Sequence, residues 1–308
     1  MSGCLLGPSN SREGFKECKG GVVVVVLIEF LNRYLGNVPL WYAVDRSKLP
    51  EPVLSRFLQL SPDHETEQFL EEAVHKSDWV FTQLWHSVAR SFLGFFMTQT
   101  SINGLLGRGS MFVFSGEGCR LLLGVAADWC GATLLDLGAG DGRTTAVMAP
   151  YFAEVFVTEV SAPMRSILAK RGFRLLEADT WTTSGHKFDV ISCLNLLDRC
   201  DRPLSLLQDL RAALKPGGKV LVALVLPFNP YVEIGWEGHR PSEWLPIQGD
   251  NFEQQVTSVM ADVFEPAGFA VERWARVPYL CEGDLNQAFY WLDDAVFVLS
   301  AVDQEGNS

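Results

Sequence analysis

Residues 136–142, Asp-Leu-Gly-Ala-Gly-Asp-Gly, constrain the fold of this chain most, because they follow directly on the apolar residues 133–135. Glycines at this spacing between a strand and a helix are typical of the first turn of a Rossmann-like sheet, where a ligand lies against the backbone. Gly138 and Gly140 would allow the tight turn and the close approach. Asp136 ends the predicted strand, and its carboxylate suits a cationic ligand.

Strands and helices alternate from residue 132 onwards, which predicts an α/β fold with a parallel, doubly wound sheet. The predicted strands are nearly continuous apolar runs, at residues 133–137, 155–160, 188–193, 219–226, 269–277 and 295–299. The predicted helices lie between them, at residues 144–151, 163–171, 203–214 and 252–267.

Four regions are expected along the 308 residues. Residues 1–40 form a poorly determined N-terminus, whose valine-rich run at 20–28 is a targeting segment or a buried strand, and is too short to span a membrane. Residues 41–131 form a helical extension that covers the substrate side, with aromatic side chains at helical spacing over 66–96 and a glycine-punctuated loop at 101–110. Residues 132–302 form the Rossmann-like domain, and 303–308 a tail.

Composition excludes several classes of protein. The formal net charge is −12, from 25 basic and 37 acidic residues, which argues against a nucleic-acid binder. Seven cysteines include no Cys-x-x-Cys pair, and five histidines include no His-x-x-x-His pair. We therefore expect neither a disulfide framework nor a metal site.

The glycine loop alone fits either a dinucleotide or S-adenosylmethionine. Glu159 stands nineteen residues after Gly140, at the end of the next predicted strand, where its carboxylate would accept hydrogen bonds from a ribose diol. A dinucleotide site needs Gly-x-Gly-x-x-Gly, whereas this loop has Gly-x-Gly-x-Gly after Asp136. Together with the acidic residues 177–179 and the Lys-Pro-Gly-Gly turn at 215–218, this pattern favours S-adenosylmethionine.

The predicted strand at 188–193 is followed by polar side chains that would face the methyl donor, since ligands bind beyond the carboxyl ends of parallel strands. Asn195 and Asp198 are the candidates, and capping of the next helix is the alternative for Asp198. Asp201 is expected to cap that helix. Cys193 is expected to be a buried strand residue.

Several long segments resemble the methyltransferase-like protein 9 family, also called DREV. They are residues 100–115, 135–142, 189–201, 223–228, 230–233, 278–284 and 292–299, and the resemblance covers roughly residues 70–300. It implies a seven-stranded, Rossmann-like methyltransferase sheet. It also implies a protein-histidine N-pros (Nπ) methyltransferase that uses S-adenosylmethionine and acts on His-x-His motifs with a small x. The partners would be proteins with such motifs, and the location the endoplasmic reticulum or the mitochondrion, with the cytoplasm as the alternative.

By motif position, the resemblance assigns roles to individual residues. Glu159 would hold the ribose, Asn195 would contact the cofactor near its reactive end and take part in catalysis, and Tyr279 would lie in the cofactor site. Asp198 would bind the target imidazole and fix its tautomer. Tyr231 and Arg108 are further candidates for substrate binding, and pairing with the cofactor carboxylate or capping of its loop stay open as alternatives for Arg108.

Two other readings stay open: a methyltransferase for a small imidazole compound such as a histidine dipeptide, and a cofactor-binding interaction protein without catalysis. Asn229 departs from the family pattern, because it stands where a histidine is expected in vertebrate members. No role of that histidine is carried over to this chain.

Overall fold

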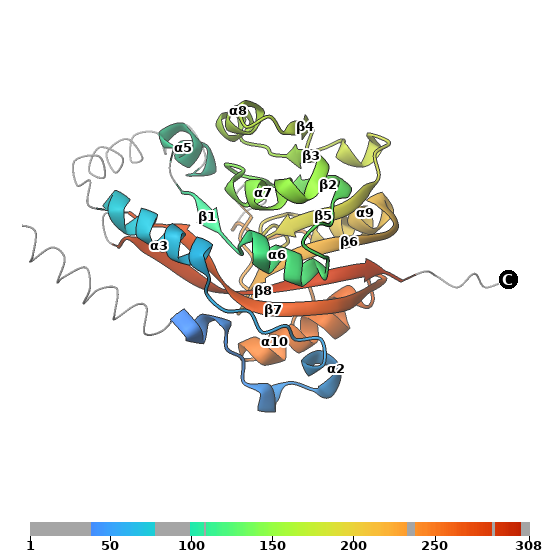
Figure 1. Cartoon of the computed structure of the whole chain (residues 1–308). Coiled ribbons are helices and arrows are strands. Elements are labelled where there is room, and N and C mark those ends of the chain that lie inside the picture. Colours follow the sequence, from blue (N-terminus) through green and yellow to red (C-terminus); the bar gives the residue numbers. More distant parts are fainter. Residues whose placement is uncertain (1–37, 78–98, 108, 233–237, 285–286, 303–308) are drawn as a thin grey trace, which may run out of the picture. The chain divides into compact units, whose positions relative to one another are not determined.

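The computed structural model describes residues 38–77, 99–107, 109–232, 238–284 and 287–302 (Figure 1). The described residues from 41 to 302 belong to the larger of two compact units. Most of the predicted N-terminal region, with its valine-rich run, lies outside the described residues.

An eight-stranded sheet organises the larger unit, in the order β1-β7-β8-β6-β5-β2-β3-β4. The family resemblance implies seven strands, and the structure has an eighth, β1, at the edge beside β7. The strand bounds are β1 Met111–Phe112, β2 Gly131–Leu137, β3 Phe152–Thr158, β4 Arg174–Leu176, β5 Phe188–Leu194, β6 Leu214–Val225, β7 Phe269–Glu282 and β8 Phe289–Ala301.

The prediction of a wholly parallel sheet is wrong at one end. Strands β2 to β6 pair in parallel, but β8 is antiparallel to both β6 and β7, and β1 is antiparallel to β7. Only residues 283–288 join β7 to β8. A connection this short can join only antiparallel neighbours, since a parallel crossover needs a dozen or more residues. Figure 1 shows β7 and β8 as the two longest strands, lying along each other.

The helices predicted after residue 132 are confirmed. They are α7 Arg143–Met148 continued by η3 Ala149–Tyr151, α8 Ala162–Lys170, α9 Pro203–Ala213, and α10 Phe252–Ser258 continued by the π-helix η5 Val259–Phe264. A short helix, η4 Trp181–Thr183, precedes β5.

Short helices dominate the described part of the predicted extension: η1 Val38–Tyr42, η2 Arg46–Lys48, α2 Glu51–Leu54, α3 His64–Ser77, α5 Gln99–Leu106 and α6 Gly116–Leu123. The predicted helical stretch 66–96 is confirmed up to Ser77, and the rest of it lies outside the described residues. The predicted loop at 101–110 is wrong for its first half, which is helix α5. Ile102 of α5 is buried and α5 packs on α8, so tertiary packing overrides the weak helix propensity of glycine and asparagine.

The core lies between the sheet and the helices α2, α9 and α10. Leu135, Ile191 and Val222 place the centres of β2, β5 and β6 in it with no exposed surface. Trp274 of β7 is fully buried, and its indole nitrogen donates to the Val53 carbonyl at 2.8 Å, which ties α2 to the sheet. This packing fixes the positions of the carboxyl ends of β2 and β5. No helix in the described residues is long and apolar enough to cross a membrane.

Candidate active site

The glycine loop after β2 has the backbone that the sequence predicted. Gly138 has φ +66° and Gly140 has φ +56°, a region that side chains with a Cβ atom rarely adopt. A Cβ atom on Gly138 would lie 3.1 Å from the Leu196 side chain, and one on Gly140 would lie 3.7 Å from Met111. The loop therefore runs close to its surroundings, and a larger side chain at Gly138 would fill the space beside it.

Asp136 lies at the end of β2, where it is 3% exposed. Its Oδ1 accepts from the Ser192 hydroxyl at 2.6 Å, and its Oδ2 accepts from the Thr145 hydroxyl at 2.5 Å. Burial raises the pKa of this carboxyl to about 6, although the two hydroxyls act in the opposite direction. Asp136 therefore joins β2, β5 and α7 at the base of the glycine loop.

Glu159 follows β3 and is also buried. Its Oε2 accepts from the Gly140 backbone nitrogen at 3.0 Å, and its Oε1 accepts from the Ser161 nitrogen at 2.7 Å. The carboxylate thus braces the glycine loop against the start of α8. Each oxygen has a second lone pair, so the ribose contact inferred from the sequence stays a prediction.

One cavity brings together four of the predicted site residues: Asp136, Gly138, Asn195 and Tyr279. The sequence reading did not single out Met111 of β1, which also lines the cavity and whose sulfur contacts the Tyr279 hydroxyl. Burial raises the pKa of Tyr279 well above its usual value, so its hydroxyl stays protonated.

Gly109 and Ser110, which precede β1, are held in place by polar contacts, one of them to the glycine loop. Glu282 at the end of β7 accepts from the Gly109 nitrogen at 2.9 Å, and its other oxygen pairs with Lys76 of α3 at 2.8 Å. The Ser110 hydroxyl donates to Asp141 of the glycine loop at 2.8 Å. These contacts place Met111 against the cavity. Arg108, a candidate for substrate binding, lies outside the described residues.

Asn195 directly follows β5 in the left-handed backbone region, with φ +53°. Its side-chain Nδ2 donates to Oδ2 of Asp294 at 2.8 Å, while its Oδ1 is buried without a protein partner. Asp294 lies in the middle of β8 and is fully buried, and its Oδ1 also has no partner. Burial and the nearby charge of Asp198 raise the pKa of Asp294 to about 8.

The sequence reading missed Asp294. The sequence does contain a signal, because two adjacent acidic residues, Asp293 and Asp294, directly precede the apolar residues of the predicted strand at 295–299. Burying a carboxyl group in a sheet costs free energy, so such a group is a candidate for a functional role.

Asp198 is 3% exposed, and its Oδ2 forms an ion pair with Arg199 Nε at 3.1 Å. Its Oδ1 is buried without a partner. Burial raises the pKa of the Asp198 carboxyl despite the lowering effect of Arg199. Because α9 begins at Pro203 and its N-cap residue is Arg202, Asp198 does not cap this helix.

Tyr231 contacts the backbone of Asp198. Its backbone nitrogen donates to the Asp198 carbonyl at 2.8 Å, and its ring is 44% exposed. The ring stacks on His239, with centroids 4.5 Å apart, and the Arg199 guanidinium lies 6.0 Å from its centre. Asn229, two residues earlier, is exposed. Arg199 therefore contacts both the buried carboxyl of Asp198 and the exposed ring of Tyr231.

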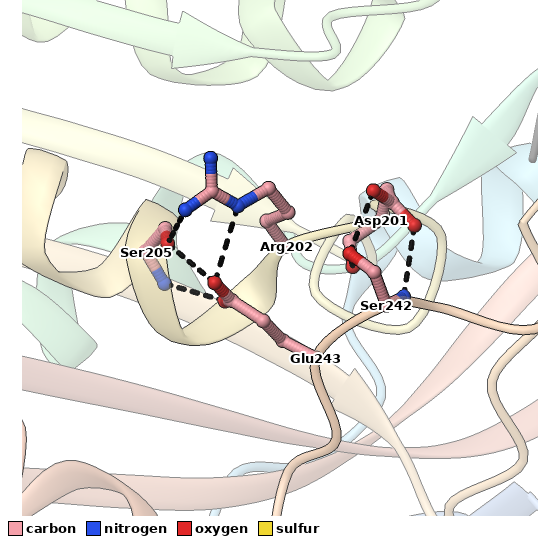
Figure 2. A network of polar contacts seen from close by, with 5 residues as sticks. All are labelled: Asp201, Arg202, Ser205, Ser242 and Glu243. Atoms are coloured by element: carbon pink, nitrogen blue, oxygen red, sulfur yellow. Dashed lines mark hydrogen bonds and ion pairs between the residues drawn. The ribbon is translucent and has the colours of Figure 1, made fainter.

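A network of polar contacts ties the loop that carries His239 to the start of α9 (Figure 2). Glu243 accepts from the Ser205 nitrogen at 2.8 Å and from the Ser205 hydroxyl at 2.5 Å, and it pairs with Arg202 at 3.2 Å. Asp201 accepts from the nitrogen and the hydroxyl of Ser242, both at 2.8 Å. The prediction that Asp201 caps α9 is therefore wrong, because Glu243 supplies the cap from a distant loop.

The donor set of the cavity fits S-adenosylmethionine. Two carboxylates, Asp136 and Asp141, line it, and among the described residues that line it there is no lysine or arginine. A pyrophosphate would need donors or positive charge, whereas a sulfonium and an ammonium group are stabilised by carboxylates. Within the described ranges, no group of three or more His, Cys, Asp or Glu residues could hold a metal ion. Strand order, glycine loop and acidic cavity together define the S-adenosylmethionine-dependent methyltransferase class.

Within that class, the model of the DREV methyltransferase family matches residues 41–301. The chain belongs to the DREV methyltransferase family. The resemblance noted in the sequence is thus confirmed at the level of the family, and S-adenosylmethionine is the cofactor that the fold and the cavity accommodate.

Curated relatives are more distant. A ubiquinone biosynthesis O-methyltransferase of Ruegeria pomeroyi is 32% identical over 157 residues, which are 47% of this chain and 63% of that protein. A protein of the same name from Cereibacter sphaeroides is 30% identical over 45% of this chain and 60% of its own length. The chain thus spans less than two thirds of the length of these relatives.

Two solved structures illustrate the structural similarity. The N-methyltransferase NodS of Bradyrhizobium japonicum, in complex with S-adenosyl-L-homocysteine, has a TM-score of 0.38 and 15% identity over 59% of this chain and 83% of its own. A TehB-like methyltransferase of Corynebacterium glutamicum has a TM-score of 0.39 and 18% identity over 61% and 88%. The family assignment rests on the family model.

Proposed function

We propose that this protein transfers the methyl group of S-adenosylmethionine to the Nπ atom of a histidine in His-x-His motifs of other proteins, where x is small. The proposal extends the family resemblance of residues 189–201 and 278–284 to the substrate. The observation that carries it is the Asp198 carboxyl, which is buried, has one oxygen without a partner, and is joined through Arg199 to the exposed ring of Tyr231.

The reaction does not need a strong general base. A histidine with a pKa of ~6.5 is mostly neutral at pH 7, and its unprotonated ring nitrogen already has a lone pair. The bound donor supplies an electrophilic methyl group: the Nπ–carbon bond forms as the carbon–sulfur bond breaks. Orientation should therefore provide most of the rate enhancement.

Asp198 decides which nitrogen reacts. Nπ can attack only if the ring proton is on Nτ, and a carboxylate that accepts the Nτ–H bond holds this tautomer. The free Oδ1 of Asp198 is suited to this contact. The same carboxylate stabilises the positive charge that develops on the ring as the methyl group is transferred. Tyr231 offers a flat aromatic face on which the second histidine of the motif would stack.

The test is methyl transfer from labelled S-adenosylmethionine to a peptide with alternating histidines. Matched peptides carry alanine at each histidine in turn, and amino-acid analysis distinguishes Nπ- from Nτ-methylhistidine. We expect label only as Nπ-methylhistidine, and only where the His-x-His spacing is intact.

Two other substrates are tested in the same assay. A histidine dipeptide that is methylated better than the peptide would replace the proposed substrate by a small imidazole compound. Methylation of a catechol, with no transfer to any imidazole, would indicate O-methylation, in agreement with the names of the curated relatives. Donor binding without transfer to any acceptor would favour an interaction protein.

A further inference from the structure

A buried hydrogen bond joins two strands that lie far apart in the sequence. Asn195 follows β5, Asp294 lies on β8, and the 2.8 Å bond between their side chains spans 99 residues of sequence. Asn195 lines the cavity beside the glycine loop, whereas Asp294 is not among the residues that line it. The bond therefore connects the cavity wall to a group behind it.

The direction of this hydrogen bond determines which end of the Asn195 carboxamide is left to bind a ligand. A carboxamide has a donor end and an acceptor end, and rotation by half a turn exchanges them. Because the ionised carboxylate of Asp294 can only accept, it binds the NH2 end of Asn195 and leaves the oxygen end unbound. That oxygen, Oδ1, is buried and has no partner in the protein.

We propose that Asp294 is a positioning residue: it holds the Asn195 carboxamide so that its oxygen accepts from the positively charged methyl donor. An acceptor at this point favours a sulfonium or ammonium group, whereas the NH2 end would repel it. This arrangement costs folding free energy, because Asp294 is fully buried within β8 and leaves its own Oδ1 without a partner. This inference rests on the proposed methyltransferase function but not on the identity of the acceptor.

The experiment is a double-mutant cycle in the affinity for S-adenosylmethionine, measured by titration calorimetry without any acceptor at about pH 9, because the pKa of Asp294 is raised to about 8 and its carboxyl is ionised only above that value. The variants are Asn195→Ala, Asp294→Asn and the combination. Asparagine at 294 has the same shape but can present either end to Asn195, so it no longer selects one orientation. We expect each single variant to bind the donor about tenfold more weakly. If Asp294 acts through Asn195, the combination should also lose about tenfold, rather than the hundredfold of independent effects.

Asp293→Asn is the matched control. Asp293 is the neighbouring residue, is partly exposed and pairs with Arg276 at 2.7 Å, so its substitution removes the same charge outside the site. We expect unchanged donor affinity for this variant. Additive losses in the double variant, or full affinity in Asp294→Asn, would overturn the proposal. Thermal unfolding of each variant shows whether it is folded, and Asp294→Leu, which removes the acceptor altogether, provides a second test if Asp294→Asn does not fold.

The outcome is independent of the histidine substrate. A protein that binds the donor but methylates no histidine would contradict the proposed acceptor and leave the cycle intact. Additive losses in donor affinity with normal histidine methylation would contradict the role of Asp294 alone.

Discussion

Asp294 should make the stability of the protein depend on pH near neutrality. The pKa of its carboxyl is raised from 3.8 to about 8 by burial, so between these values the folded state holds a proton that the unfolded state has released. The free energy of unfolding therefore falls as pH rises through this window, by ~1.4 kcal/mol per pH unit while the folded carboxyl stays protonated. Between pH 6 and pH 8 this single group should cost the folded state about 2 kcal/mol.

Asp294→Asn removes this dependence and keeps the shape of the side chain. The wild type should thus lose about 2 kcal/mol more than the variant between pH 6 and pH 8. Urea unfolding at pH 6, 7 and 8 measures the difference, and groups such as Asp136, whose pKa is raised to about 6, affect both proteins alike. The exposed neighbour variant Asp293→Asn should follow the wild-type profile. Parallel profiles for the wild type and Asp294→Asn would show that the carboxyl at 294 does not titrate in this window, and would refute the reasoning.

Three further substitutions test other parts of the site. Gly138→Arg should abolish donor binding in calorimetry, because its backbone is left-handed and a Cβ atom there already lies 3.1 Å from Leu196; retained affinity would place the donor elsewhere. Asp198→Ala should lower turnover on a His-x-His peptide by more than tenfold and leave donor affinity within about twofold, and equal losses in both would assign Asp198 to the donor site instead. Glu243→Ala should cost about 1 kcal/mol in unfolding experiments through the lost cap on α9, and should raise KM for the peptide more than it lowers kcat, whereas an unchanged KM would show that the network of Figure 2 does not position the loop whose His239 stacks on Tyr231.

The sequence predicted the long elements well, because their patterns extend over several residues. The strands at 133–137 and 188–193 are continuous apolar runs, and both are found in β2 and β5. β1 has two residues and β4 three, which is too short for an alternating or apolar pattern to be recognised. The glycine and asparagine of residues 101–106 predict a loop. The structure has helix α5 there, and its packing on α8 accounts for the difference.

The candidate site was predictable where the chemistry follows a strand directly. Asp136, Gly138 and Asn195 were found in this way and line one cavity. Met111 and Asp294 were missed, because the sheet brings them to the site from distant parts of the sequence and neither belongs to a motif with its own chemical signature. The cap on α9 was missed for the same reason, since Glu243 reaches it from 38 residues away.

The place of β8 in the sheet has a consequence for biosynthesis. β8 follows the other seven strands in the sequence, yet it lies between β6 and β7. During synthesis on the ribosome, at roughly 5–20 residues per second, the glycine loop and β5 emerge well before β8. Until β8 inserts, β6 and β7 have no common neighbour and Asn195 has no Asp294. A nascent chain therefore cannot assemble the complete site early, and premature release before β8 should leave an exposed apolar edge on β6 for chaperones to recognise.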